Sequence, residues 1–435
     1  MSLHTIGSDA RYILPASYDS VPEQFRSNKS AKPIPCSLQT VNLPAMSGDQ
    51  SLGGTSLIQL PCGASAGYMC NPYLRFTISV SGTAKAKGVF KFKGSAGSAT
   101  MAINRLATFV NSQMVDNLQN AWSIYDALLS HSTSQPWLEN DGSVMLGAGT
   151  NYVQEEDAGN ATFADLTFAV PMLGLLGSQQ AIPLYLINGT LQIQVDWQSA
   201  IGSFLGNGST VHTYTACTFK NVALVYDKIS CEQAFVDSVR ADMMKGNKFV
   251  VGYTNYQTTA LATAKDTANA TFNYGLNVSS LRGVIMTQHA DLSAQTSLSV
   301  SQANGLNQFR VSLDGRLISN LNNDSAQPAL VFSELQKTMG RLFDASISEP
   351  VAQASIAYAK GAATLAADVY VFNASKFAVG ANCQRVNEGL AFSGTPCSVV
   401  SIQYGGATAV ISSFIHFISD FQLLVTADGS VEIVR

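Results

Sequence analysis

Charged residues are scarce in this sequence. Only 12% of its 435 residues are charged, against roughly 25% in an average soluble domain. A free-standing monomer normally covers its surface with lysine and glutamate, whereas uncharged polar groups cost less to bury between subunits than unpaired ions do. The shortage of charge therefore predicts a chain whose surface is largely covered in an assembly, or alternatively a secreted β-protein rich in serine and threonine.

An excess of basic residues is also absent. The chain has 25 basic and 29 acidic residues and a net charge of -4, so it has no overall field that attracts nucleic acid. Residues 1–52 have little periodicity, contain several prolines, and balance four basic against four acidic side chains. This pattern predicts an extended N-terminal arm that lies along a neighbouring subunit. We expect no strong nucleic-acid binding, because an arm that neutralises phosphates needs surplus lysine and arginine.

Catalytic motifs are missing as well. The sequence contains no zinc-protease, nucleophile-elbow, phosphate-loop or dinucleotide-binding pattern, and its histidines lie far apart in the chain. His416 alternates with Phe414 and Ile418, which indicates a core or interface histidine and not a ligand. We therefore expect no enzyme activity, and we assign no catalytic, cofactor-binding or metal-binding residues and no cofactor.

Three other polar segments were weighed as candidate sites. The acidic loop Glu155–Asp157 is typical of a solvated loop, although paired carboxylates can bind calcium or act in glycosidases. The segment Gly94–Ser98 is expected to be a flexible loop, since no Lys-Ser/Thr pair follows it. The lysines Lys85, Lys87, Lys91 and Lys93 form one basic patch, which we interpret as a half-exposed hairpin, with genome or membrane contact as the alternative.

Neither disulfides nor membrane spans are indicated. The seven cysteines are odd in number, lack C-x-x-C spacing and are expected to be buried, reduced thiols of a protein made in a reducing compartment. The amino terminus lacks a signal segment. The apolar run Leu166–Leu176 is far shorter than a bilayer span of about 20 residues. Its end, Pro171–Leu176, is a candidate either for subunit packing or for a buried loop.

A period of two dominates the chain and predicts strands with one buried face. Apolar residues alternate at Leu74–Val80, Leu166–Val170, Leu191–Trp197, Phe249–Tyr253 and Phe309–Leu313, and further strands are expected at 214–226, 369–372, 399–404 and 410–418. Asn188-Gly189, Asp314-Gly315 and Asp428-Gly429 are dipeptides typical of tight hairpins.

Three segments change to a helical period. Leu118, Trp122, Tyr125 and Leu129 predict a helix over 116–130, with Asp116 as its cap. Apolar steps of four predict a second helix over 232–245, which Gly246 ends. A third helix is expected over 331–343.

The order of elements is similar in the two halves of the chain. Each half gives strands, then an amphipathic helix, then more strands, which predicts an all-β protein of two antiparallel jelly-roll sandwiches with a few short helices. The expected organisation is an arm at 1–52, a first jelly roll at 53–230, a linker helix at 231–248 and a second jelly roll at 249–435.

At this point the chain resembles the double jelly-roll major capsid proteins of icosahedral DNA viruses, the group of tailless phages, adenoviruses and virophages. The likeness lies in the order of segments: Pro171–Leu176, Ile182–Leu186, Leu191–Trp197, Val222–Asp227, the helix at 232–245, Phe309–Leu317 and the helix at 331–343.

The resemblance implies a homotrimer that forms a pseudo-hexameric capsomer, with strands roughly normal to an icosahedral shell. It further implies a place in the virion, contacts with neighbouring capsomers, penton and minor capsid proteins, and an inner membrane as a further candidate partner. No catalytic residues carry over. The alternative function is a fibre, adhesin or other extracellular β-sandwich that binds a partner.

Overall fold

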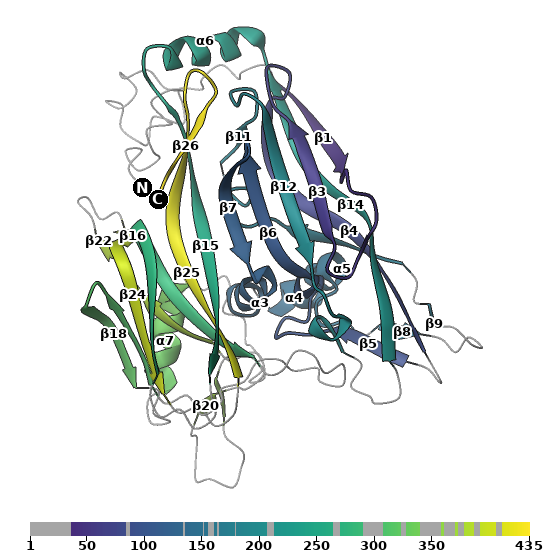
Figure 1. The fold of residues 1–435 in the computed structure, drawn as a ribbon, viewed down its shortest axis with the longest axis vertical. Helices are drawn as coiled ribbons and strands as arrows, with labels where there is room; N and C mark the ends of the chain where they lie inside the picture. Colours follow the sequence, from purple (N-terminus) through teal and green to yellow (C-terminus); the bar gives the residue numbers. More distant parts are fainter. Residues whose placement is uncertain are drawn as a thin grey trace.

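The computed structural model describes residues 36–83, 88–133, 135–150, 152–154, 161–162, 165–178, 180–206, 213–263, 270–289, 308–322, 328–339, 358–360, 370–372, 378–386, 392–405 and 411–435. Within these residues the molecule is built from antiparallel sheets. The strands of the first half lie beside those of the second half (Figure 1). This arrangement confirms the all-β fold class.

The first half contains two main sheets. One has the order β1-β14-β4-β10, with the short strands β2, β9 and β11 attached, and the other has the order β3-β12-β6-β7. The strands of the first sheet are β1 (Cys36–Pro44), β2 (Gln50–Ser51), β4 (Tyr68–Thr83), β9 (Ala161–Thr162), β10 (Leu166–Pro171), β11 (Ile182–Pro183) and β14 (Thr213–Cys231). Those of the second are β3 (Thr55–Pro61), β6 (Ile103–Val110), β7 (Gln113–Gln119) and β12 (Thr190–Trp197). A small sheet adds β5 (Gly88–Phe92), β8 (Tyr152–Gln154) and β13 (Leu205–Gly206).

Aromatic side chains fill the space between the two main sheets. Trp197 of β12 stacks on Phe219 of β14 with ring centroids 4.1 Å apart, and Phe76 of β4 meets the Trp197 ring edge-on. The buried indole donates a hydrogen bond from Nε1 to Ser56 Oγ at 2.9 Å, which satisfies its polar atom. The alternation predicted for Leu74–Val80 and Leu191–Trp197 is confirmed, because the apolar residues of both segments are buried.

Residues 36–44, expected as part of the arm, form a strand of the first sheet. β1 pairs with β14 from Cys36↔Cys231 to Pro44↔Ala223. The rest of the expected arm up to residue 35 lies outside the described residues. β14 is a single strand of 19 residues, and it includes the strand expected at 214–226.

The first helical segment starts later than expected. Helix α3 spans Ala121–Ser132, preceded by Asn120 in the left-handed region at φ 48. Asp116 is therefore not a cap. It lies in β7, paired opposite Thr108 of β6. The sequence did not predict this strand, because the buried aspartate interrupts the apolar alternation that would have marked it. The short helices α4 (Gln135–Glu139) and α5 (Asp141–Leu146) follow, and 3-10 turns lie at η3 (Ala99–Ala102) and η4 (Ile201–Ser203).

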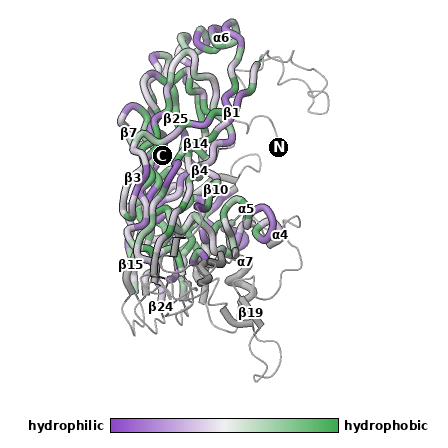
Figure 2. Tube along the Cα trace, turned by 90° about the vertical axis from the view of Figure 1, so that its right-hand side faces the viewer, coloured by the Kyte–Doolittle hydropathy of each residue, from purple (hydrophilic) through white to green (hydrophobic). Residues whose placement is uncertain are grey.

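Helix α6 (Gln233–Met243) connects the two halves and lies at one end of the molecule (Figure 1). Its buried residues Val236, Val239 and Met243 repeat at helical spacing. The helix expected over 232–245 is confirmed. The third helix, α7 (Pro328–Thr338), is also present, while residues 340–343 of that prediction lie outside the described part. In the side view, α4, α5 and α7 lie on the same side of the strands (Figure 2).

The second half forms one large sheet that folds into two layers. Its order is β15-β25-β16-β24-β17-β18, with β21 paired to β16 and β26 to β25. The strands are β15 (Phe249–Thr263), β16 (Ala270–His289), β17 (Gln308–Leu313), β18 (Arg316–Asn322), β21 (Ala378–Asn382), β24 (Thr395–Gly405), β25 (Ile411–Val425) and β26 (Val431–Val434). Short pairs join β19 (Tyr358–Lys360) to β20 (Tyr370–Phe372) and β22 (Arg385–Val386) to β23 (Phe392–Ser393).

Strand β16 belongs to both layers. Its first part, from Ala270 to Leu281, pairs with β24, and its second part, from Leu281 to His289, pairs with β25. Register shifts between these parts bend the strand. Tyr274 of the first part stacks on Phe417 of β25 with ring centroids 4.8 Å apart. The two layers therefore face each other as a sandwich with one shared strand.

Two of the three expected hairpin turns are confirmed. Asp314 and Gly315, both at positive φ, join β17 to β18, and the turn at Asp428-Gly429 joins β25 to β26. Asn188-Gly189 does not close a hairpin. It links β11, which pairs with β4, to β12 in the other sheet. The prediction of a hairpin was wrong here. The dipeptide favours a positive φ, which Gly189 has, but a connection between two sheets can use the same backbone conformation.

Candidate functional site: the seam between the two halves

We call the contact between the two halves the seam. The first half contributes β7, α3 and the loop 172–178, and the second half contributes β15, β16 and β25. Within the described residues, β7 and β15 are edge strands of their own sheets. Their side chains meet where an edge would otherwise be exposed, and covering edges prevents unwanted strand pairing.

Asp116 lies at the centre of the seam. Its Oδ2 accepts a hydrogen bond from the backbone N–H of Leu175 at 3.0 Å, and its Oδ1 accepts one from Asn255 Nδ2 at 2.8 Å. Burial raises the pKa of this carboxyl to about 7, against the lowering effect of the backbone hydrogen bonds. One side chain thus joins a strand, a loop of its own half and β15 of the other half.

Gly174 leaves the space that Asp116 occupies. A Cβ at this position, where φ is +69, would lie 1.5 Å from Asp116 Oδ2. Leu175 and Leu176 beside it are buried. Of the two interpretations of Pro171–Leu176, the structure therefore supports the buried loop of the chain itself.

Tyrosine hydroxyls fix the backbone on both sides. Tyr253 of β15 donates to the Val115 carbonyl at 3.1 Å, and Tyr125 of α3 donates to the Pro171 carbonyl at 2.8 Å. Burial is the main reason that the pKa of each phenol is raised. Both therefore remain protonated donors at physiological pH.

An aromatic cluster lies at the α3 side of the seam. The Trp122 ring meets His289 at 4.9 Å and Phe414 at 4.8 Å, both edge-on. Trp122 comes from the first half, while His289 and Phe414 come from β16 and β25. These ring contacts join the two halves, and such edge-on pairs add about 0.5–1.5 kcal/mol each beyond their buried area.

His289 of this cluster and the nearby His416 both form hydrogen bonds with threonine hydroxyls. His416 Nδ1 lies 2.9 Å from Thr258 Oγ1, and its Nε2 lies 3.3 Å from Thr287 Oγ1. His289 Nε2 bonds to the same Thr287 hydroxyl at 3.1 Å. Burial lowers the pKa of both histidines to about 3, and for His416 the neighbouring His289 adds to the effect. His416 is thus a core histidine with both ring nitrogens bonded, as the alternation predicted.

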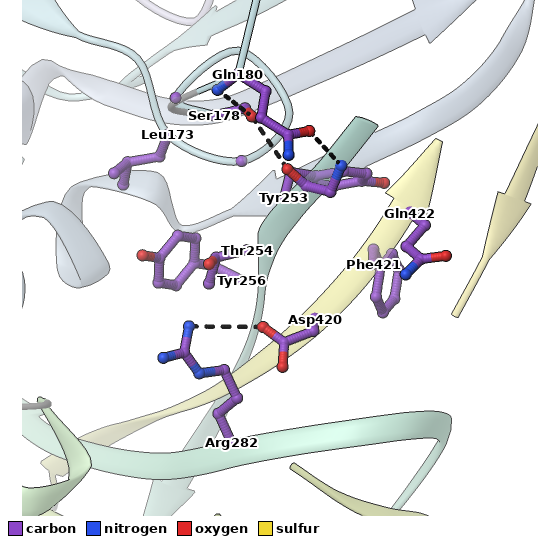
Figure 3. Close-up of a pocket in the computed structure, with 13 residues that line it drawn as sticks. Leu173, Ser178, Gln180, Tyr253, Thr254, Tyr256, Arg282, Asp420, Phe421 and Gln422 are labelled. Carbon is purple, nitrogen blue, oxygen red and sulfur yellow. Dashed lines mark hydrogen bonds and ion pairs between the residues drawn. The ribbon is translucent and has the colours of Figure 1, made fainter. Parts of the chain in front are cut away.

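A cavity of about 560 Å³ opens beside the seam (Figure 3). Gln180 accepts the Gly252 N–H at its Oε1 at 2.9 Å, and Ser178 Oγ donates to the Gly252 carbonyl at 3.1 Å. Arg282 and Asp420 form an ion pair of 3.5 Å on the opposite wall. Ser178 and Gln180 therefore tie this part of the first half to β15, and the opposite wall carries a paired charge.

A second contact joins the halves near α6. The backbone N–H of Asn188 donates to the Gly429 carbonyl at 3.0 Å, so the connection before β12 meets the turn between β25 and β26. Arg240 of α6 donates from Nη2 to the Tyr185 carbonyl at 3.1 Å. The helix that connects the two halves is thereby fixed to the first one.

The other sequence candidates fall in different places. Gly94–Ser98 is not a free flexible loop, because the N–H groups of Ser95 and Ala96 each donate to the Asp126 carboxylate at 2.9 Å. Lys93 is buried and cannot belong to an exposed basic patch, whereas Lys91 is partly exposed. Lys85, Lys87 and the acidic loop Glu155–Asp157 lie outside the described residues.

The cysteines are not all buried, contrary to the expectation. Cys217, Cys383 and Cys397 are buried, but Cys36 is exposed and Cys62, Cys70 and Cys231 are partly exposed. In the described part of the chain, no group of three or more His, Cys, Asp or Glu side chains could hold a metal ion. No helix among the described residues is long and apolar enough to cross a membrane.

The contacts described for the seam are buried hydrogen bonds and ring contacts that hold the two halves together.

No protein-family model matches the sequence, and no curated protein matches it. Solved structures do match. PBCV-1 VP54, fitted into a reconstruction of the virophage Sputnik, gives a TM-score of 0.59 at 12% identity over 92% of this chain and 97% of that chain. The mavirus major capsid protein gives 0.52 at 11% identity over 91% and 89%. The Faustovirus major capsid protein gives 0.53 at 9% identity over 90% and 91%.

This chain has the double jelly-roll fold of viral major capsid proteins. The match includes both halves, since about nine-tenths of each chain is covered. The expected double jelly-roll fold is therefore confirmed. Sequence reasoning missed the seam of this double jelly roll, because Asp116, Asn255 and His289 come from distant segments with no shared local pattern.

Proposed function

We propose that this protein is the major capsid protein of an icosahedral virus. The observation that supports it best is that the fold of both halves matches viral major capsid proteins over about nine-tenths of the chain. A shell subunit needs a rigid body that keeps its shape while it is pressed by neighbours. The buried hydrogen bonds and ring contacts of the seam supply that rigidity.

The protein acts by assembling and not by catalysis. Three copies, each with two sandwiches, form a pseudo-hexameric capsomer, and capsomers tile the shell of the virion. With only 12% charged residues, lateral surfaces can be covered without burying many unpaired ions. Neighbouring capsomers, penton and minor capsid proteins are its partners, and an inner membrane is a further candidate.

The division of the chain follows from the same proposal. The first jelly roll extends over 53–230, the linker over 231–248 and the second jelly roll over 249–435, with α6 inside the linker. Residues 1–52 precede the first roll, and β1 and β2 within them pair with β14 of its first sheet.

The test is the mass and shape of the purified full chain. Native mass measurement should give a species of three times the 46.1 kDa chain mass, and electron microscopy at higher concentration should show pseudo-hexagonal units in sheets or shells. Because few charges are available for the contacts, the trimer should persist from low salt to 1 M NaCl. A stable monomer that does not assemble at any concentration would falsify the proposal.

A further inference from the structure

Two cysteines lie opposite each other at the end of the first sheet that leads into α6. Cys36 is the first residue of β1 and Cys231 is the last residue of β14, and the two are directly opposite in the antiparallel register. Directly opposite residues project from the same face, with Cβ atoms about 4.5–5.5 Å apart. A disulfide needs about 3.5–4.5 Å between these atoms, so only a small adjustment at the strand ends is required.

The surroundings of the pair support access from solvent. Cys36 is exposed and Cys231 is partly exposed. A hollow of about 190 Å³ lies against Ser230, Cys231 and Gln233, which is room for a small thiol reagent. The pKa of the Cys231 thiol is raised by burial and further by its neighbour Cys36, which agrees with the closeness of the two sulfurs.

We propose that Cys36 and Cys231 form an intramolecular disulfide when the folded protein meets an oxidising medium. The oxidant is a small-molecule disulfide such as oxidised glutathione. One protein thiolate attacks it, forms a mixed disulfide and releases one small thiol. The second protein thiolate then displaces the other small thiol. Two protein thiols and one small disulfide thus give one protein disulfide and two small thiols.

The bond would be a covalent cross-link between the beginning and the end of the first sandwich. It closes a loop that begins at β1, the first described strand of this half, and ends two residues before α6. Cross-links that close long loops restrict the unfolded chain most. The proposal does not depend on the capsid function, because a chain that never assembles can still form this bond.

A second cysteine pair provides an internal control. In the second half, burial and then the neighbouring Cys397 raise the pKa of Cys383, and both thiols are buried. An external reagent should not reach them while the protein is folded. Comparing the two pairs therefore tests whether a disulfide needs only two neighbouring thiols or also needs thiols that the reagent can reach.

The experiment treats the reduced, folded full chain with oxidised glutathione, alkylates the remaining thiols and maps peptides by mass. We expect a cross-linked pair of peptides that contain Cys36 and Cys231, with Cys383 and Cys397 alkylated only after unfolding. The oxidised protein should melt about 5–10 °C higher than the reduced protein. Cys36→Ser and Cys231→Ser should each abolish the rise, and Cys70→Ser should keep it.

Three results would overturn the proposal. Cys36 and Cys231 could both remain alkylatable after oxidation, Cys36 could link to a second copy of the chain on a non-reducing gel, or the melting temperature could stay unchanged in the cross-linked protein. Assembly is measured separately, so failure of the disulfide and failure of the capsid proposal are distinguishable.

Discussion

Asp116 of β7 and Asn255 of β15 are joined by a buried hydrogen bond of 2.8 Å between Oδ1 and Nδ2. The two residues are 139 positions apart in the sequence and belong to different sandwiches. Since the same carboxyl also accepts the Leu175 N–H, its removal affects a strand and a loop of the first half together with a strand of the second. The two sandwiches should therefore lose stability together when it is changed.

Replacement of Asp116 by alanine tests this coupling. The variant leaves the Leu175 N–H and the Asn255 amide without their acceptor, and a buried unsatisfied donor costs about 1–3 kcal/mol. We expect the free energy of unfolding to fall by about 3 kcal/mol in total, measured by urea denaturation. Asp165→Ala is the control, because Asp165 is exposed and its contacts with Ser79 and Lys220 lie at the surface of the first half, so little change is expected. Equal effects of the two changes would contradict the role of Asp116.

Gly174 offers a matched pair with Gly149. Both have positive φ, +69 and +64, but a Cβ on Gly174 would lie 1.5 Å from Asp116 Oδ2, whereas a Cβ on Gly149 meets nothing within 4 Å. Gly149→Ala should cost only the backbone strain, about 1–2 kcal/mol. Gly174→Ala should cost clearly more, because it also displaces the aspartate. The urea midpoints of unfolding of the two variants are compared, and Gly174→Ala should have the lower one. Similar midpoints would mean that the loop at Gly174 can move aside.

Trp122→Ala should loosen both sandwiches at once. Loss of a buried tryptophan typically costs about 3–5 kcal/mol, and this ring contacts His289 and Phe414 of the other half. Hydrogen exchange should increase in β7, β16 and β25. In Trp197→Ala, whose ring lies inside the first sandwich, the increase should be confined to that sandwich. Exchange that stays local in Trp122→Ala would show that the seam does not couple the halves.

Buried titratable groups give the stability a defined pH dependence. The pKa of His289 and of His416 falls from 6.5 to about 3 on folding, so their contribution is present above pH 6.5 and is lost as the pH falls toward 3. The pKa of Asp116 rises from 3.8 to about 7, so its contribution has the opposite sign in the same window. The two histidines outweigh the one aspartate. The net contribution of these three groups to the free energy of unfolding should therefore fall from pH 6 to pH 4.

Two variants separate the opposite contributions of histidine and aspartate to the pH dependence of stability. His289→Phe keeps an aromatic ring beside Trp122 and should make the loss on acidification shallower by about 1.4 kcal/mol per pH unit. Asp116→Asn removes the opposing group and should make the loss steeper by a similar amount. Both slopes come from urea denaturation at several pH values, with the wild-type chain as reference. A slope unchanged in His289→Phe would mean that this histidine already titrates normally in the folded state.

The absence of nucleic-acid binding is also testable. With 25 basic and 29 acidic residues, the chain lacks the cationic surplus that gives non-specific binding, which is typically about 10⁻⁴–10⁻⁶ M at physiological salt. Fluorescence anisotropy of a labelled duplex should show no saturable binding at micromolar protein in 150 mM salt. Saturable, salt-sensitive binding would instead reveal a basic surface that the composition conceals.

Strands with regular alternation could be predicted from the sequence, because each needs only its own side chains to alternate between core and solvent. Leu191–Trp197 is such a strand, and 232–245 is the helical equivalent. β7 could not be predicted, since Asp116 takes a buried position where an apolar residue would mark the strand. Its acceptor role depends on Asn255 and Leu175, which no local pattern connects to it. The same holds for Cys36 and Cys231, which only the register of β1 and β14 brings together.

The long strands also have a consequence for dimensions. β14 has 19 residues, and at about 3.3 Å per residue it is about 60 Å long. In a shell whose subunits stand with their strands upright, as the capsid proposal implies, this strand alone would give a wall about 6 nm thick. Thickness measured in a section through the particle would then be a readout of strand length.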